Sequence, residues 1–220
     1  MSAPDLSPVV RAVHAARARV PAQRAVVCAV SGIDASGKGY LAGHLAGRLE
    51  DEGLRVAVVG VDPWLNLPDR RFAKENAGEH FYRNALRLEE MFSRLVLPLR
   101  RSGSIRLEAK VVEETSADFE TRLYAFDHVD VIVLEGIFLF KRAFRRLYDV
   151  AVWVECTFET ALRRAIDRGQ EGLPAEQTIA AYASIYFPAQ LVHFERDDPR
   201  SAADVTLVND PRLQAREAAG

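Results

Sequence analysis

The sequence has little cysteine, no long apolar run and almost no surplus of charge, and each shortage excludes a class of protein. Both cysteines, Cys28 and Cys156, stand in apolar segments, which is typical of buried thiols and not of a disulfide framework or a zinc site. No segment reaches the ~18 apolar residues that span a bilayer. The N-terminus lacks the basic and then apolar layout of a signal peptide. We therefore expect a cytoplasmic protein that has no membrane partner.

The charges nearly cancel, because 29 lysines and arginines stand against 31 aspartates and glutamates. A dedicated nucleic-acid-binding protein needs a basic surplus for the phosphates, so we expect no nucleic-acid partner. The 220 residues, of which 49% are hydrophobic, fit one compact domain with a sizeable core. Composition by itself indicates no chemistry.

Short apolar runs alternate with helical patterns along the chain. The runs at 25–30, 55–60, 129–134, 150–154 and 203–208 are typical of buried strands. Helices are expected at 8–19, 40–52, 86–101, 141–148, 157–168 and 175–187, a loop at 61–78, and a short hairpin or an edge strand at 105–114. This alternation predicts an α/β fold with a mostly parallel central sheet and helices on both faces. The long middle region is better explained as an insertion over one face of the sheet than as a second domain.

The segment from Gly32 to Gly39, Gly-Ile-Asp-Ala-Ser-Gly-Lys-Gly, matches the pattern G-x-x-x-x-G-K between a strand and a helix. Its glycines let the backbone wrap so that amide groups point at phosphate oxygens, and the helix N-terminus adds its positive dipole end. Lys38 would bring a full charge to the β- and γ-phosphates. The alternative is an ordinary glycine-rich turn, which the flanking strand and helix disfavour. Nucleotide contacts are expected from Gly32, Ala35, Ser36, Gly37, Lys38, Gly39 and Tyr40.

Gly39 departs from this pattern, because serine or threonine normally offers a hydroxyl to Mg²⁺ at this position. Three consequences remain open: water fills the position, a carboxylate elsewhere carries the metal, or catalysis is weak. Phosphate binding by the backbone and by Lys38 should survive the change.

Two carboxylates follow predicted strands. Asp62 comes after the second strand and Glu135 closes the third, and ligands of open α/β sheets bind at the carboxyl ends of parallel strands. Asp62 there can accept a proton from an attacking hydroxyl, and its alternative role is a turn aspartate beside Pro63. Glu135 suits a Mg²⁺-supporting acid, whereas its alternative is a solvent-facing strand end. We prefer a functional role for Asp62 because it follows its strand next to the phosphate loop, and for Glu135 because Gly136 beside it favours a close approach of backbone or ligand.

At this point the chain resembles the uridine kinase and phosphoribulokinase family of P-loop kinases. The matching segments are 32–38, 61–64, 134–138, 158–168, 182–193 and 203–208, so the resemblance covers most of the chain. It implies a three-layer P-loop NTPase fold in one domain over 1–220. Within that domain it implies an N-terminal helix and lead-in at 1–20, a substrate-side insertion at 61–128 and a lid at 163–174.

The resemblance also implies transfer of the γ-phosphoryl group of ATP to a hydroxyl of a small molecule, most often a nucleoside, with ATP and Mg²⁺ as cofactors. By this analogy Asp62 is the base, Glu135 and Asp62 support Mg²⁺, and Lys38 grips phosphate. Arg164 and Arg168 stand four residues apart on one helix face, from which they could close over the transferring phosphoryl group. A solvated basic face is the alternative, and for Arg163 it is equally plausible. Members of this family often associate, so a homo-oligomer is a further expectation.

The acceptor is less defined, because Leu65 stands where nucleoside-specific members carry a tyrosine. Candidate acceptor contacts are Trp64, His80, Phe81, Tyr82, Arg83 and Ile137, with Tyr124 and His128 as further options. Phe81 and Tyr82 could instead pack the insertion onto the sheet, and His193 belongs more naturally to a packed helix. Two alternatives stay open: a P-loop kinase for a non-nucleoside metabolite, and a nucleotide-binding sensor without turnover.

Overall fold

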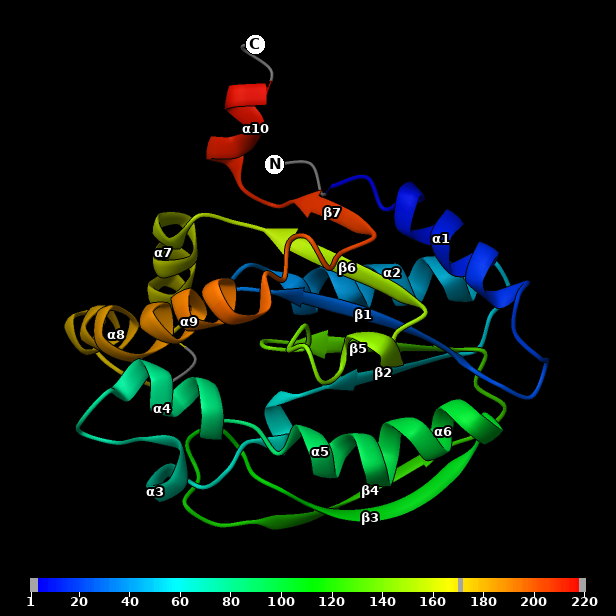
Figure 1. Ribbon diagram of the computed structural model, residues 1–220, viewed down its shortest axis with the longest axis horizontal. Helices are drawn as coiled ribbons and strands as arrows, with labels where there is room; N and C mark the ends of the chain where they lie inside the picture. Colours follow the sequence, from blue (N-terminus) through cyan, green and yellow to red (C-terminus); the bar gives the residue numbers. More distant parts are fainter. Residues whose placement is uncertain (1–3, 170–171, 218–220) are drawn as a thin grey trace.

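The centre of the molecule is a five-stranded sheet in the order β2-β5-β1-β6-β7, with every neighbouring pair parallel (Figure 1). A computed structural model describes residues 4–169 and 172–217. The strands are β1 (Val26–Gly32), β2 (Val56–Gly60), β5 (Val131–Gly136), β6 (Val150–Glu155) and β7 (Val205–Val208). The predicted α/β fold with a parallel central sheet is therefore confirmed. The chain runs from β1 out to β2, returns to β5 and then continues to the other side, so the carboxyl ends of β1, β2 and β5 meet at one edge.

Helices cover both faces of the sheet, because successive strand residues point to opposite sides. Val26, Cys28 and Val30 face one side, where they pack with α1 (Ser7–Arg17) and α2 (Lys38–Asp51). Val27 and Ala29 face the other side, which the remaining large helices cover. Both cysteines are buried and free, as predicted. Among the described residues, no helix combines the length and the apolar character that crossing a bilayer requires.

Two long helical rods on the second face each contain a π-helical turn just before a proline. The first consists of α5 (Leu88–Met91), a π turn at Phe92–Val96 and α6 (Leu97–Ser102), and the second of α8 (Ala175–Ala181), a π turn at Tyr182–Tyr186 and α9 (Phe187–Asp197). Pro98 and Pro188 follow these turns by two residues. A proline lacks the amide hydrogen for the helical bond and clashes with the carbonyl one turn earlier, and a wider turn relieves both problems. The second rod therefore continues to Asp197, ten residues beyond its predicted end.

The prediction of a short helix at 141–148 was wrong, because this segment holds only a 3-10 turn at Arg145–Leu147. Its local backbone hydrogen bonds are single turns, such as the amide of Phe144 to the carbonyl of Lys141 at 2.9 Å, and other polar groups bond to other elements. The amide of Arg142 donates to Asp197 at 3.0 Å, and the Lys141 ammonium donates to the carbonyl of Tyr82 at 2.5 Å. The predicted loop at 61–78 also contains short helices, a 3-10 turn at Asp62–Trp64 and α3 (Pro68–Arg71), and α4 (Ala77–Asn84) begins at its end.

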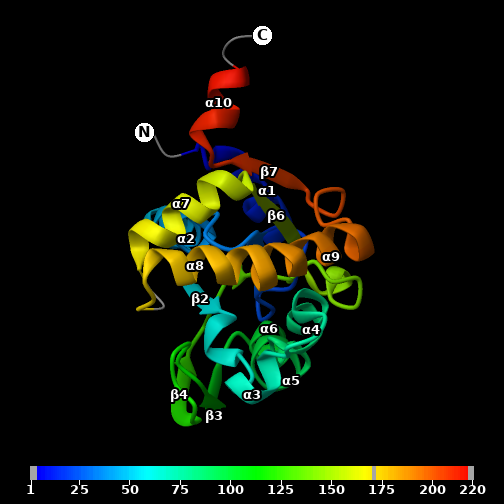
Figure 2. The ribbon, with the colours of Figure 1, turned by 90° about the vertical axis from the view of Figure 1, so that its left-hand side faces the viewer.

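The segment at 105–114 forms one strand of a hairpin, β3 (Ile105–Val111), which pairs antiparallel with β4 (Glu120–Phe126). Figures 1 and 2 show this hairpin beyond the β2 edge of the sheet, whereas α10 (Pro211–Glu217) extends beyond β7 at the opposite end. The hairpin and helices α3 to α6 all fall within the predicted insertion at 61–128.

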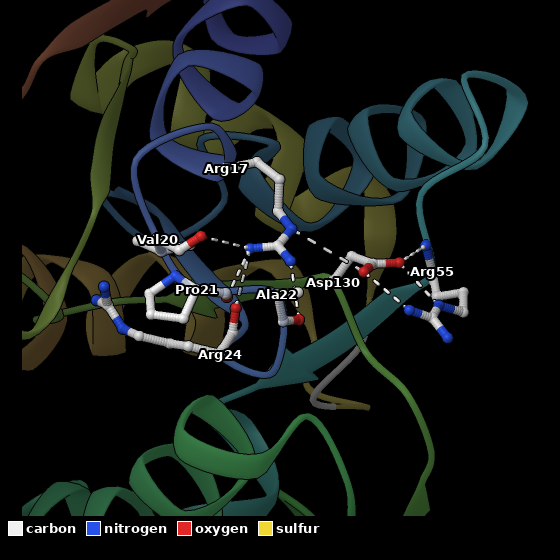
Figure 3. Close-up of polar contacts among 7 residues, drawn as sticks. All are labelled: Arg17, Val20, Pro21, Ala22, Arg24, Arg55 and Asp130. Atoms are coloured by element: carbon white, nitrogen blue, oxygen red, sulfur yellow. Dashed lines mark hydrogen bonds and ion pairs between the residues drawn. The ribbon is translucent and has the colours of Figure 1, made fainter.

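Arg17 joins α1 to the amino-terminal side of the sheet (Figure 3). Its guanidinium donates to four carbonyl oxygens in the turn before β1, at Val20 (3.5 Å), Pro21 (3.1 Å), Ala22 (2.9 Å) and Arg24 (3.2 Å). It also lies 4.0 Å from Asp130, which forms an ion pair with Arg55 at 2.8 Å. The guanidinium of Arg17 thus orders the turn before β1 and holds α1 close to Asp130, the residue directly before β5.

We expect Arg17→Ala to lower the free energy of unfolding by about 2 kcal/mol, because four carbonyls, two of them in partly buried hydrogen bonds, lose a charged donor together. Arg17→Lys should recover only part of the loss, since one ammonium cannot reproduce the fork. Urea unfolding measures both, with exposed Arg11→Ala on the same helix as the matched control. Equal effects of the Arg17→Ala and Arg11→Ala substitutions would contradict this role.

Candidate active site

The phosphate loop wraps between β1 and α2 as its glycine pattern predicts. Ala35 (φ +54°) and Gly37 (φ +87°) adopt left-handed conformations, and α2 begins at Lys38 directly after them. The amide of Ser36 closes a turn onto the carbonyl of Ile33 at 3.2 Å. The Lys38 side chain is buried, and its charge opposes the effect of burial on two nearby carboxyls, described below. The loop therefore combines open amide groups, a helix N-terminus and one buried cation.

The outer side of the loop is held by side chains from two other elements. Arg164 of α7 (Phe158–Arg168) donates to the carbonyl of Ser36 at 3.1 Å, and Asn209, which follows β7, donates to the same oxygen at 2.8 Å. A Cβ at Gly37 would lie only 2.4 Å from Asn209 Nδ2, so this position requires glycine. Asn209 was not predicted, although its place at the carboxyl end of a parallel strand was a usable signal.

Asp62 and Glu135 lie beside Lys38 at the carboxyl ends of β2 and β5. Asp62 is exposed to solvent on one side, but the protein around it partly desolvates the carboxyl and raises its pKa, while the charges of Lys38 and Arg168 oppose that rise. Burial also raises the pKa of Glu135, with Lys38 opposing and Asp62 adding to the rise. The amide of Val61 donates to the Glu135 carbonyl at 3.0 Å, which fixes the two acids relative to each other. One cation and two carboxylates are thus brought together at one sheet edge.

Asp34 is a third carboxylate close enough to act on Asp62 and Glu135, and the sequence motifs did not indicate it. It stands inside the phosphate loop, where its Oδ1 accepts the amide of Ala35 at 2.8 Å. Its negative charge raises the pKa of both Asp62 and Glu135. An acidic residue within a loop built for phosphate was the signal that could have identified it.

The arrangement fits Mg²⁺ bound mainly through water and phosphate. Hard carboxylate oxygens of Asp62 and Glu135 suit this ion, which keeps several waters when it binds beside nucleotide phosphates. Consistently, the described part of the chain has no group of three or more His, Cys, Asp or Glu side chains that could hold a metal alone. A Cβ at Gly39 would lie 3.7 Å from Glu135 Oε2, an ordinary contact distance. The position of the missing hydroxyl is therefore directly beside Glu135.

We expect Gly39→Ser to lower the Mg²⁺ concentration for half-maximal activity by up to about tenfold, because the new hydroxyl would stand beside Glu135 without a steric clash. The measurement is a Mg²⁺ titration at saturating ATP. Gly43→Ser on the same helix is the matched control, since a Cβ there meets no atom within 4 Å. An unchanged Mg²⁺ requirement would show that water already completes the metal site.

Gly136 makes the close approach that the sequence suggested, and the partner is Val61. A Cβ at Gly136 would lie 2.1 Å from Val61 Cγ2 and 2.9 Å from Val61 Cβ. Val61 is completely buried and directly precedes Asp62.

We expect Gly136→Ala to cost about 1–3 kcal/mol of stability through overpacking and to lower kcat by displacing Asp62. Thermal unfolding and steady-state kinetics measure the two effects. Gly47→Ala is the control, because its added methyl meets open space in a helix, where alanine is preferred. If Gly136→Ala kept wild-type kinetics, the contact between Gly136 and Val61 would not determine the position of Asp62.

Several predicted acceptor residues are used in packing. Phe81 is buried, with its ring 5.1 Å from Tyr186 and 5.8 Å from Phe72. Tyr82 is buried and donates its hydroxyl to Asp197 at 2.5 Å. For these two aromatics the structure corresponds to the packing interpretation, because α4 lies against α9 there.

The other candidates differ in their surroundings. His80 Nε2 lies 2.9 Å from the carbonyl of Arg70, and Arg83 is exposed and paired with Glu79 at 2.6 Å. Trp64 is completely buried and stacks on Tyr124 at 5.9 Å. His128 is exposed at a turn with φ +51°. Ile137 is buried in the core beside Gly136, and Tyr40 is 61% exposed at the start of α2, where its ring can meet a ligand.

Part of the predicted lid at 163–174 lies outside the described residues, namely positions 170 and 171. Within the described part, α7 ends at Arg168, and the charge of this residue lowers the pKa of Asp62. Arg164, one turn earlier, lies on the phosphate loop as described above. His193 is fully buried in α9, as expected for a packed helix.

Comparisons with known proteins agree with this geometry. A model of the phosphoribulokinase / uridine kinase family matches residues 27–184. No curated protein sequence matches at a significant level. The fold is shared with a structure described as a possible uridine kinase from Bacillus stearothermophilus, with a TM-score of 0.66 and 20% identity over 90% of this chain and 98% of that one.

Two further solved structures share the fold. One is described as a candidate fructose transport system kinase from a Silicibacter species (TM-score 0.70, 21% identity, 92% of this chain and 98% of that one). The other is D-glycerate 3-kinase from Cryptococcus neoformans (TM-score 0.59, 12% identity, 87% of each chain). The family match covers well over half of the chain, and the fold and the phosphate loop are those of a P-loop kinase. The chain therefore belongs to the phosphoribulokinase / uridine kinase family.

Proposed function

We propose that the protein transfers the γ-phosphoryl group of ATP to a hydroxyl of a small molecule. The observation that carries this proposal is the grouping of Lys38, Asp62 and Glu135 at the sheet edge beside the phosphate loop. Phosphoryl transfer asks a protein mainly for positioning and for charge neutralisation. The buried Lys38 supplies positive charge, and the two acids are placed to act on the acceptor hydroxyl and to hold Mg²⁺.

Each residue has a distinct part in the proposed reaction. The acceptor oxygen attacks the γ-phosphorus, the bond from that phosphorus to the β-γ bridging oxygen breaks, and ADP leaves. Asp62 accepts the proton of the acceptor hydroxyl, and its raised pKa makes it a stronger base than an ordinary aspartate. Lys38 neutralises phosphate charge, and Mg²⁺ would supply further neutralisation near Glu135. Arg168 is placed to add positive charge beside Asp62.

A nucleoside is the first acceptor to consider, because the family resemblance implies it and one fold neighbour is described as a possible uridine kinase. A non-nucleoside hydroxyl compound is the second. It is favoured by one observation, that the aromatics Phe81 and Tyr82, which could have recognised a base, are buried in the packing of α4. Fold neighbours described as sugar and glycerate kinases belong to this second class.

The experiment is ADP release from Mg·ATP with two panels of acceptors, one of nucleosides and one of sugars and hydroxy acids. We expect one panel to stimulate ADP release strongly, with the phosphorylated product seen by ³¹P NMR. Asp62→Asn is the negative control for every positive acceptor. ATP binding without stimulation by any acceptor would overturn the proposal in favour of a nucleotide sensor, the role that Gly39 would suit.

A further inference from the structure

A cavity of about 450 Å³ lies away from the phosphate loop. Its walls are the end of α4, the connection from α4 into α5, the segment 141–144 and the end of α9. Neither the phosphate-loop residues nor Asp62 and Glu135 line it. Four of its lining residues are cationic, Arg83, Arg87, Lys141 and Arg142, and two are acidic, Glu89 and Asp197. The cavity is therefore a basic hollow separate from the catalytic centre.

The acid at its base, Asp197, is already fully engaged. Its Oδ2 accepts the Tyr82 hydroxyl at 2.5 Å and His193 Nδ1 at 2.7 Å, and its Oδ1 accepts the amide of Arg142 at 3.0 Å. Burial works in the opposite direction, but these hydrogen bonds lower the pKa of Asp197 to about 2. Asp197 is thus a fixed carboxylate that holds the wall together and is not free to turn toward a ligand or a cation.

Lys141 is a largely enclosed cation that forms no ion pair within the described part of the chain. Its ammonium donates to the carbonyl of Tyr82 at 2.5 Å and lies 4.2 Å from the centroid of the Tyr82 ring. These contacts use one of its three N–H donors. Burial lowers the pKa of Lys141 to about 8, and attraction to Asp197 only partly opposes this. A cation in such a place gains from any anion that enters the cavity.

Arg142, the next residue, offers a second unused cation. Within the described residues its backbone amide forms a hydrogen bond and its guanidinium forms none, and the side chain is exposed at the cavity. The other two arginines are occupied, Arg83 with Glu79 at 2.6 Å and Arg87 with Glu90 at 2.6 Å. Lys141 and Arg142 are therefore the two groups left to receive a ligand.

We propose that this cavity binds the phosphate group of a small phosphate monoester through Lys141 and Arg142. A phosphate dianion matches two positive charges, and it accepts from a compact ammonium and a planar guanidinium together. Glu89 at the rim repels extended polyanions, so a ligand with a single phosphate suits the cavity better than a triphosphate or a nucleic acid. The site would operate beside a nucleotide already bound at the phosphate loop.

The test measures binding to the full chain saturated with Mg²⁺ and a non-hydrolysable ATP analogue, so that the phosphate loop is already filled. The probes are inorganic phosphate, glycerol 2-phosphate and acetate. Isothermal titration calorimetry measures the binding of each one. We expect one phosphate-dependent site, weakened at least tenfold by Lys141→Met and by Arg142→Met. Arg146→Met, an exposed arginine nearby that does not line the cavity, is the matched control and should leave binding unchanged.

The three probes distinguish the sources of the anion. Tighter binding of the ester than of inorganic phosphate supports a metabolite ligand, and equal binding supports the phosphate group alone as the recognised feature. Acetate binding as tight as phosphate, no site in the saturated protein, or a site that persists in both the Lys141 and Arg142 variants would overturn the proposal. Because Arg142 is exposed, its variant keeps the test decisive even if Lys141→Met unfolds the protein.

Discussion

Asp62→Asn is expected to lower kcat by about two to four orders of magnitude, the usual range for loss of a positioned general base. Asparagine keeps the size of the side chain and cannot accept the proton of the acceptor hydroxyl. ATP affinity should change little, because the phosphates are held by the loop and Lys38. Steady-state kinetics with the identified acceptor and equilibrium binding of ATP measure the two quantities. Asp69→Asn, on exposed α3 in the same region, is the matched control.

The pH dependence provides a second readout of the same residue. Partial desolvation by the surrounding protein raises the pKa of Asp62 above the usual value for an aspartate, and the base acts only when it is ionised. Activity should therefore fall as pH decreases through this raised pKa, at a higher pH than an ordinary aspartate would produce. In Asp62→Asn that acid limb should disappear from the residual activity. A fully active Asp62→Asn enzyme would remove the base assignment.

The parts of the site that follow from local sequence were predictable. A phosphate loop needs its glycines, lysine and helix N-terminus within eight residues, and Gly32 to Gly39 holds them all. Asp62 and Glu135 were identified because the carboxyl end of a buried parallel strand is itself a local feature. Asn209 and Arg164 meet at the carbonyl of Ser36 from residues more than a hundred positions away. Only the tertiary fold creates that contact. The sequence indicated a role for Arg164 and offered the strand end as a signal for Asn209, but no local pattern shows that the two side chains share one carbonyl.

The errors in the fold have the same origin. Helix α4 contains Gly78, which lowers helix propensity, but a Cβ there would lie 2.4 Å from Pro188 Cβ, so packing against α9 requires the glycine. The segment 141–148 has helical residues, and its polar groups bond to Tyr82 and Asp197 instead. In both places a tertiary contact overrides the local preference. The near balance of charge noted in the sequence likewise conceals local polarisation, because the charge of Lys38 acts on both Asp62 and Glu135 at one sheet edge.

Lys38→Ala should have the second large effect, because Lys38 is the one cation of the described residues whose charge lowers the pKa of both Asp62 and Glu135. We expect kcat/KM to fall by about two to three orders of magnitude, as for loss of one preorganised charge at a developing anion. ATP should also bind more weakly, since the β- and γ-phosphates lose their charged partner. Lys38→Arg is the control that keeps the charge and changes the shape.

The same substitution should move the pH profile in a direction that a purely structural role would not. The charge of Lys38 lowers the pKa of Asp62, whereas the charge of Asp34 raises it. Without Lys38 the pKa of Asp62 should therefore be higher than in the wild-type protein. The acid limb of the residual activity should therefore shift to higher pH in Lys38→Ala and stay near its wild-type position in Lys38→Arg. A limb that does not move in Lys38→Ala would show that Lys38 serves the phosphates alone. A shift would establish that one lysine both binds the nucleotide and keeps the base ionised, which ties base activation to the same charge that holds ATP.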